Sequence, residues 1–184
     1  KLARIYPGRR MVAVALAPAL STIALLATPA TLWLVVALDA VAVAVIAIDL
    51  FTLPFRHDFS VERHTQRIAS LQKRHLVGLT VLSHSHRPFQ VEIRDGVPQV
   101  LHPTPADFTQ KIAPRSRFSC DYVLRPSRRG AFRIETVHLR ATSRWKLWNR
   151  LLDYPAQSTL HVYPDMKQLG EYALLARTNR LSLL

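Results

Sequence analysis

MVAVALAPALSTIALLA (residues 11–27), TPAT (28–31) and LWLVVALDAVAVAVIAIDLFTL (32–53) follow one another without a break and decide the fold. The first and third segments are apolar, and the four residues between them carry no charge. As helices rising about 1.5 Å per residue, the two apolar segments would be about 25 Å and 33 Å long, and the hydrocarbon core of a bilayer is about 30 Å thick. The sequence therefore predicts a transmembrane helical hairpin formed by helices at 11–27 and 32–53.

Basic residues flank this hairpin on one side. Four occur within residues 1–10, Arg56 follows the second apolar segment, and the turn has none. Cytoplasmic flanks of membrane helices are enriched in lysine and arginine. We therefore expect a two-pass protein in which residues 1–10 form a basic cytoplasmic N-terminus and residues 57–184 are also cytoplasmic. A cleaved signal peptide ending near residues 27–30 is the alternative, and a second full-length apolar segment directly after it disfavours that interpretation.

The net charge of the chain is +13, and the excess is concentrated in residues 111–150, which hold eleven basic and two acidic residues. Basic domains tethered beside a membrane are attracted to anionic lipids. Nucleic-acid binding also uses such charge, but no nucleic-acid-binding motif accompanies it, so we expect membrane lipids and no nucleic acid as partners. Cys120 is the only cysteine, which excludes an intrachain disulfide and agrees with a reducing compartment.

Residues 57–164 contain short segments in which apolar and polar side chains alternate, as in 89–94 and 118–124. A period of two is typical of half-buried strands, and the prolines between the segments mark turns. The segment 76–82 is apolar on both faces, which predicts a central strand, and one more strand is predicted at 160–162. Because strands recur without a helical segment between them, we predict an antiparallel immunoglobulin-like β-sandwich, the all-β part of the fold.

The pattern changes at two places. The apolar positions switch parity between Ile134 and Val137, which predicts a β-bulge near Glu135–Thr136. After the sandwich, apolar residues recur at helical spacing, so residues 165–184 are expected to form a short C-terminal helix with Asp165 as its N-cap. This segment is interpreted as a linker toward a further domain.

Two aspartates, Asp39 and Asp49, lie inside the second apolar segment, where carboxyl groups are costly and commonly functional. An intramembrane aspartyl protease would need two carboxyl groups about 3 Å apart. Ten residues of helix separate Asp39 from Asp49 by about 15 Å along the axis, so one chain does not form such a dyad. We expect Asp49 to reach the interface and Asp39 to serve in structure or oligomer contact. The alternative is an oligomeric channel or proton relay that uses Asp39.

No set of residues matches a catalytic or metal centre. His84 and His86 have the spacing that places both on one face of a strand, but no carboxyl or thiol group lies near them in the sequence. Cys120 alternates with aromatic residues, which favours a buried thiol over a nucleophile. Nucleophile-elbow and phosphate-loop motifs are absent. We therefore expect a protein that is not an enzyme and needs no cofactor or metal.

Arginines are dense around Gly130, between two predicted strands; the four are Arg125, Arg128, Arg129 and Arg133. The simpler interpretation is a charged hairpin turn in which the glycine provides a positive φ. The functional interpretation is a patch that binds an anion or a protein partner, since four arginines exceed the need of a turn. Both interpretations stay open on the sequence alone.

A second basic motif contains two tryptophans; its residues are Trp145, Lys146, Trp148 and Arg150. Beside a membrane, indole rings lie at headgroup level and basic side chains meet lipid phosphates, so the motif predicts a membrane-interface anchor. The alternative is a packing element that folds into the soluble domain.

Four motifs follow the hairpin in order: YVLRP (122–126), RRGAF (128–132), WKLWNR (145–150) and VYPD (162–165). Together they resemble the N-terminal half of the bacterial membrane proteins called the domain of unknown function 58 family. Members usually have a glycine within the segment 144–148, which this chain lacks. Members also continue into a von Willebrand factor A-like domain, and this chain ends where that half would begin, without an Asp-x-Ser-x-Ser metal motif.

The resemblance implies a place in the bacterial inner membrane and a partnership with MoxR-type AAA+ ATPases and other membrane subunits, with homo-oligomers as a further option. From it, and from the absence of a catalytic set, we expect a membrane-anchored scaffold or adaptor for the assembly or maturation of envelope or protein complexes. The four arginines are expected to contact the partner. The alternative function is a module that binds or senses anionic lipids.

Overall fold

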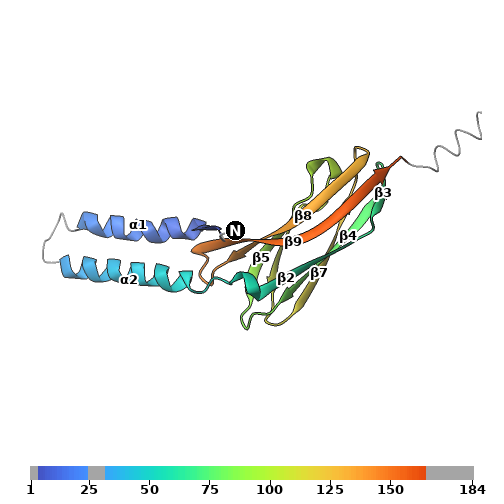
Figure 1. Cartoon of the computed structure of the whole chain (residues 1–184). Helices are drawn as coiled ribbons and strands as arrows, with labels where there is room; N and C mark the ends of the chain where they lie inside the picture. Colours follow the sequence, from blue (N-terminus) through green and yellow to red (C-terminus); the bar gives the residue numbers. More distant parts are fainter. Residues whose placement is uncertain (1–3, 25–31, 165–184) are drawn as a thin grey trace, which may run out of the picture.

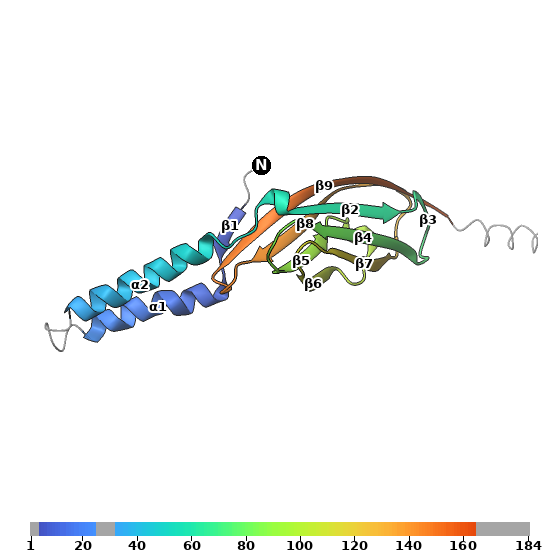
Figure 2. The same ribbon diagram turned by 90° about the horizontal axis from the view of Figure 1, so that it is seen from below.

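The computed structural model describes residues 4–24 and 32–164. Two helices, α1 (Arg9–Ala24) and α2 (Leu32–Leu50), lie side by side and extend from one end of a β-sandwich (Figure 1, Figure 2). By length and composition α2 can cross a membrane, and it ends three residues before the limit predicted from the sequence. The helix predicted for residues 165–184 lies outside the described residues.

Within the described residues, nine strands form two facing sheets. The larger sheet has the order β1-β9-β8-β5-β6, with β3 also paired to β9, and the smaller sheet has the order β2-β4-β7. All pairs are antiparallel except β3 with β9, so the prediction of antiparallel strands is confirmed apart from this short parallel pair. The bounds are β1 (Arg4–Pro7), β2 (Phe59–Thr65), β3 (Ile68–Ser70), β4 (His75–Ser83), β5 (Phe89–Asp95), β6 (Asp107–Ile112), β7 (Arg117–Leu124), β8 (Gly130–Thr142) and β9 (Trp148–Tyr163).

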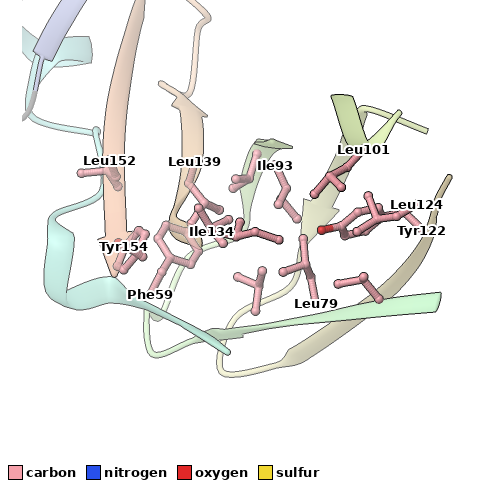
Figure 3. Close-up of a cluster of buried hydrophobic side chains, with 14 of the residues drawn as sticks. Phe59, Leu79, Ile93, Leu101, Tyr122, Leu124, Ile134, Leu139, Leu152 and Tyr154 are labelled. Atoms are coloured by element: carbon pink, nitrogen blue, oxygen red, sulfur yellow. The ribbon is translucent and has the colours of Figure 1, made fainter. Parts of the chain in front are cut away.

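The core lies between the two sheets, where alternate side chains of strands such as β4, β5 and β8 are buried. Figure 3 shows Leu79 and Tyr122 of the smaller sheet meeting Ile93 and Leu139 of the larger sheet. These four side chains are 2% exposed or less, so their apolar surface is almost fully removed from water. The prediction of a central strand at 76–82 is confirmed, since β4 lies between β2 and β7. Short 3-10 turns at Arg56–Asp58 and Gln99–Leu101 complete the sandwich.

Strand β9 is the longest element of the sandwich and differs most from the sequence prediction, which gave only 160–162. It begins beside the helices and reaches the opposite end of the sandwich, a path of about 50 Å at about 3.3 Å per residue (Figure 2). Pro155 lies in the middle of β9, where β8 is the one described strand that pairs with β9. On the other side of β9 no described strand is paired at this position, so a proline, which lacks an N–H, is tolerated there. The predicted bulge is confirmed, because the β8–β9 register shifts between Ile134 and Thr136.

The sandwich has a helix-side end and a far end. The helix-side end consists of the connections next to α1 and α2, which are residues 84–88, 113–116 and 143–147. The far end consists of residues 66–67, 71–74 and 125–129 together with the last residues of β9. Because β9 runs from one end to the other, the length of this strand separates the side chains at the two ends.

Candidate functional site

Asp49 joins the last turn of α2 to the loop between β8 and β9. Its side chain is fully buried and accepts four hydrogen bonds. Ser143 Oγ donates at 2.5 Å and Leu147 N at 3.1 Å to one carboxylate oxygen, while Trp145 N donates at 3.0 Å and Thr52 Oγ1 at 3.2 Å to the other. A buried carboxylate is stable only when its oxygens are satisfied in this way. We call this contact, between Asp49 and residues 143–147, the joint.

Two backbone features define the conformation of this loop. Lys146 has a φ of +65°, in the left-handed region that favours glycine. Gly8 N donates to Leu147 O at 2.6 Å, and a Cβ on Gly8 would lie 2.5 Å from Lys146 O, so only glycine allows this approach.

Trp148 and Arg150 follow the loop of the joint and bind the end of α2 and the segment after it. Trp148 Nε1 donates to Ile46 O at 3.0 Å, and Arg150 Nη1 donates to Pro54 O at 2.8 Å. Arg150 also lies over the Phe55 ring, 5.3 Å from its centroid. The structure thus places these two residues in the packing element that the sequence left open as an alternative. Trp145 and Lys146, from the same motif, are exposed.

The other aspartate of α2, Asp39, is half-buried and lies ten residues before Asp49. It does not contribute to the joint. The prediction that Asp49 reaches the membrane interface stays a prediction, and the structure adds that its carboxylate is enclosed by protein donors.

The four arginines around Gly130 lie at the far end, on the connection from β7 to β8 and on β8 itself. All four are exposed, and within the described residues none of them forms an ion pair. Gly130 has a φ of +140°, as the turn interpretation required. A cavity of about 710 Å³ opens beside Arg133 and is also lined by Arg67, His161 and the acidic Glu135.

A buried polar cluster that the sequence analysis missed ties the two sheets together. Arg63 Nε donates to Asp95 at 2.9 Å, and its Nη2 forms a second bond to the same carboxylate. Arg63 Nη1 donates to the carbonyls of Ile134 and Ala156, which the bulge frees from the β8–β9 ladder. Burial raises the pKa of Tyr122, whose neutral hydroxyl donates to Asp95 at 2.5 Å. The side chains of Arg63 and Asp95 are 1% and 5% exposed.

The two closely spaced histidines have separate partners. His84 Nε2 lies 3.2 Å from Ser60 Oγ, whereas His86 Nε2 accepts from Arg115 at 3.1 Å. Within residues 4–24 and 32–164, no three His, Cys, Asp or Glu side chains gather into a group that could hold a metal ion. The structure therefore does not bring these histidines together with further ligands.

Cys120 on β7 is half-buried, and burial raises the pKa of its thiol to about 11. At pH 8 this leaves about a hundredfold less thiolate than at the ordinary value of 9.0. We expect iodoacetamide to label Cys120 in the folded protein about a hundred times more slowly than in guanidinium chloride, as followed by mass spectrometry. Equal labelling rates in the two conditions would show that the thiol is reactive and contradict the prediction.

Comparison with protein-family models finds no match for this chain, and neither does comparison with curated proteins. Among solved structures, the chain is similar to the CARDB domain of a Pyrococcus furiosus protein, with a TM-score of 0.41 and 13% identity, covering 59% of this chain and 94% of that chain. It is also similar to a beta-glucosidase from Listeria innocua, with a TM-score of 0.32 and 10% identity, covering 56% of this chain and 16% of that chain. At these values neither likeness assigns a family or an activity.

Proposed function

We propose that the chain is a membrane-anchored, non-enzymatic scaffold that presents its far-end arginines to an acidic surface of a protein partner. In this proposal α1 and α2 form a two-pass hairpin in a bacterial inner membrane, and the sandwich lies in the cytoplasm. The observation that carries the proposal is the cluster of four exposed arginines, without ion pairs among the described residues, at the end of the sandwich opposite the helices.

Membrane anchoring is supported by the side chains of α2. Trp33 and Leu34 are 79% and 73% exposed, and neither sheet covers this apolar helix. In water such a continuous apolar surface is unfavourable, whereas lipid chains would cover it. The basic residues before α1 and after α2 support the cytoplasmic placement of the sandwich.

Presentation to a partner is supported by the joint. The buried Asp49 contacts and the pairing of β1 with β9 fix the sandwich on the helices, so the far end is held about 50 Å along β9 from them. Arginines at that distance lie beyond the headgroups of the membrane that holds α2. A protein surface is therefore a better ligand for them than the same membrane.

The nature of the partner follows from the resemblance to the domain of unknown function 58 family. That resemblance implies a MoxR-type AAA+ ATPase, with other membrane subunits and a role in assembling or maturing envelope or protein complexes. Exposed arginines match an acidic partner surface, because complementary charge steers association and discriminates between partners.

We expect the double variant Arg128→Glu/Arg129→Glu to retain about one tenth or less of the partner, since like charges would now face each other. The measurement is purification of the full chain from its native membrane in mild detergent, with mass spectrometry of the proteins that accompany it. The matched control is Arg115→Glu/Arg117→Glu, which changes the same charge on exposed residues at the helix-side end. Equal loss in both variants, or no loss in either, would refute the far-end patch.

A further inference from the structure

A cavity of about 550 Å³ opens on the larger sheet at its helix-side end, away from the far-end arginines. Its walls come from the β4–β5 connection, the end of β6 and the loop of the joint. Thr52, which follows α2, also lines it. The cavity therefore lies where the helices enter the sandwich.

Basic side chains dominate this cavity. Four of its lining residues are cationic, and no acidic residue lines it; the four are Arg87, Lys111, Arg144 and Lys146. All four are exposed, and among the described residues none of their side chains forms an ion pair. Glu92, on the adjoining sheet surface, is bound to Arg140. The carboxylate of Asp49 is fully buried against the loop of the joint, where it accepts hydrogen bonds from Ser143 and from two backbone amides. Four exposed cations that form no ion pair among the described residues can bind a phosphate or another strong anion.

The height of the cavity relative to a membrane follows from α2, and this step rests on the proposed function, in which α2 spans the bilayer. The 19 residues of α2 are about 28 Å long, which matches the hydrocarbon core of about 30 Å. Thr52 lies two residues past its end, so the cavity is at the level of the lipid headgroups. Trp145, exposed on the same loop, is of the residue type enriched at that level.

We propose that this cavity binds the phosphate of an anionic phospholipid headgroup from the leaflet in which α2 ends. The four cations neutralise the phosphate, and the exposed amide of Gln90 offers a hydrogen bond to a headgroup hydroxyl, as in phosphatidylglycerol. Arg144 and Lys146 belong to the loop that encloses Asp49, so a bound headgroup also stabilises the joint. The lipid thereby fixes the orientation of the sandwich over the membrane.

The test is native mass spectrometry of the full chain in mild detergent, titrated with phosphatidylglycerol or phosphatidylcholine. A cavity variant neutralises the four lining cations, and a far-end variant removes the same charge elsewhere. The cavity variant carries Arg87→Gln, Lys111→Gln, Arg144→Gln and Lys146→Gln. The far-end variant carries Arg125→Gln, Arg128→Gln, Arg129→Gln and Arg133→Gln.

We expect the wild-type chain to prefer phosphatidylglycerol, and the cavity variant to bind it about tenfold or more weakly. The far-end variant is expected to change the affinity less than about twofold, since its charges lie far from the headgroups. Lys111→Gln alone, on β6 and outside the joint, is expected to weaken binding about threefold, which keeps the test valid if the full cavity variant does not fold.

Equal loss in the cavity and far-end variants would overturn the site, as would equal affinity of the wild-type chain for the two lipids. Competition by millimolar inorganic phosphate would assign the cavity to a soluble phosphate compound and overturn the lipid assignment. A separate measurement tests the membrane anchor of the proposed function: release of the chain from native membranes by alkaline carbonate would contradict that anchor. The co-purification experiment described above tests the partner patch independently of the lipid.

Discussion

Asp49→Ala is expected to release the loop between β8 and β9 from α2. The change leaves the Ser143 hydroxyl and the amides of Trp145 and Leu147 without their acceptor. Each orphaned donor costs about 1–3 kcal/mol, so we expect a loss of about 3 kcal/mol or more in the local stability of the joint. Since about 1.4 kcal/mol is a factor of ten in an equilibrium constant, we expect hydrogen exchange about a hundredfold faster at these amides.

Hydrogen exchange with mass spectrometry on the full chain in detergent measures this effect. Asp39→Asn is the matched control, because it changes the other aspartate of α2 and leaves the joint intact. Amides in the core strand β4 report whether the sandwich itself stays folded. Unchanged protection of residues 143–148 in Asp49→Ala would show that the carboxylate does not hold the loop.

Arg63→Met is expected to destabilise the sandwich by about 3–5 kcal/mol. The substitution keeps most of the side-chain volume but leaves the buried carboxylate of Asp95 without its cation. It also removes the donor to the carbonyls of Ile134 and Ala156 at the bulge. Denaturant unfolding of the full chain in detergent, followed by tryptophan fluorescence, gives the change in the free energy of unfolding.

A double-mutant cycle separates this ion pair from general packing. Because Arg63→Met/Asp95→Asn removes the uncompensated charge, we expect it to be more stable than Arg63→Met alone. The control is Arg94→Met, which breaks a solvent-exposed pair with Asp107 and should cost less than about 0.5 kcal/mol. Equal effects of Arg63→Met and Arg94→Met would contradict a special role for the buried pair.

Much of the sandwich could be predicted because its central strands alternate cleanly. The predicted segments correspond to β4, β5, β7 and β8, and the change of parity after Ile134 located the bulge. Strand β9 could not be predicted at its full length, because Pro155 and the polar residues around it are typical of a turn. Strands β1 and β3 have only four and three residues, and their conformation is set by pairing with β9. Pairing between distant segments leaves no local signal in the sequence.

The joint was predictable only in its carboxylate. Asp49 was singled out, but two of its donors are backbone amides, and the direction of an amide depends on the loop conformation rather than on residue type. The sequence does contain a signal for the buried Arg63 cluster. Arg63 has the parity of Phe59, which faces the core, and Asp95 has the parity of Ile93. A charged residue of each sign at an inward position predicts a buried pair.

The attachment of both helices to one β-ribbon has a mechanical consequence. Residues at the start of α1 and at the end of α2 are fixed to the same turn and to the first residues of β9, through Gly8 and Asp49. Sliding of one helix past the other would break these bonds, so in the proposed membrane-anchored state a movement of the helices would reach the sandwich as rotation. With β9 as a lever of about 50 Å, a tilt of about 5° moves the arginine patch by about 4 Å. If the proposed function holds, a change of bilayer thickness would thus be transmitted to a bound partner as a sideways displacement.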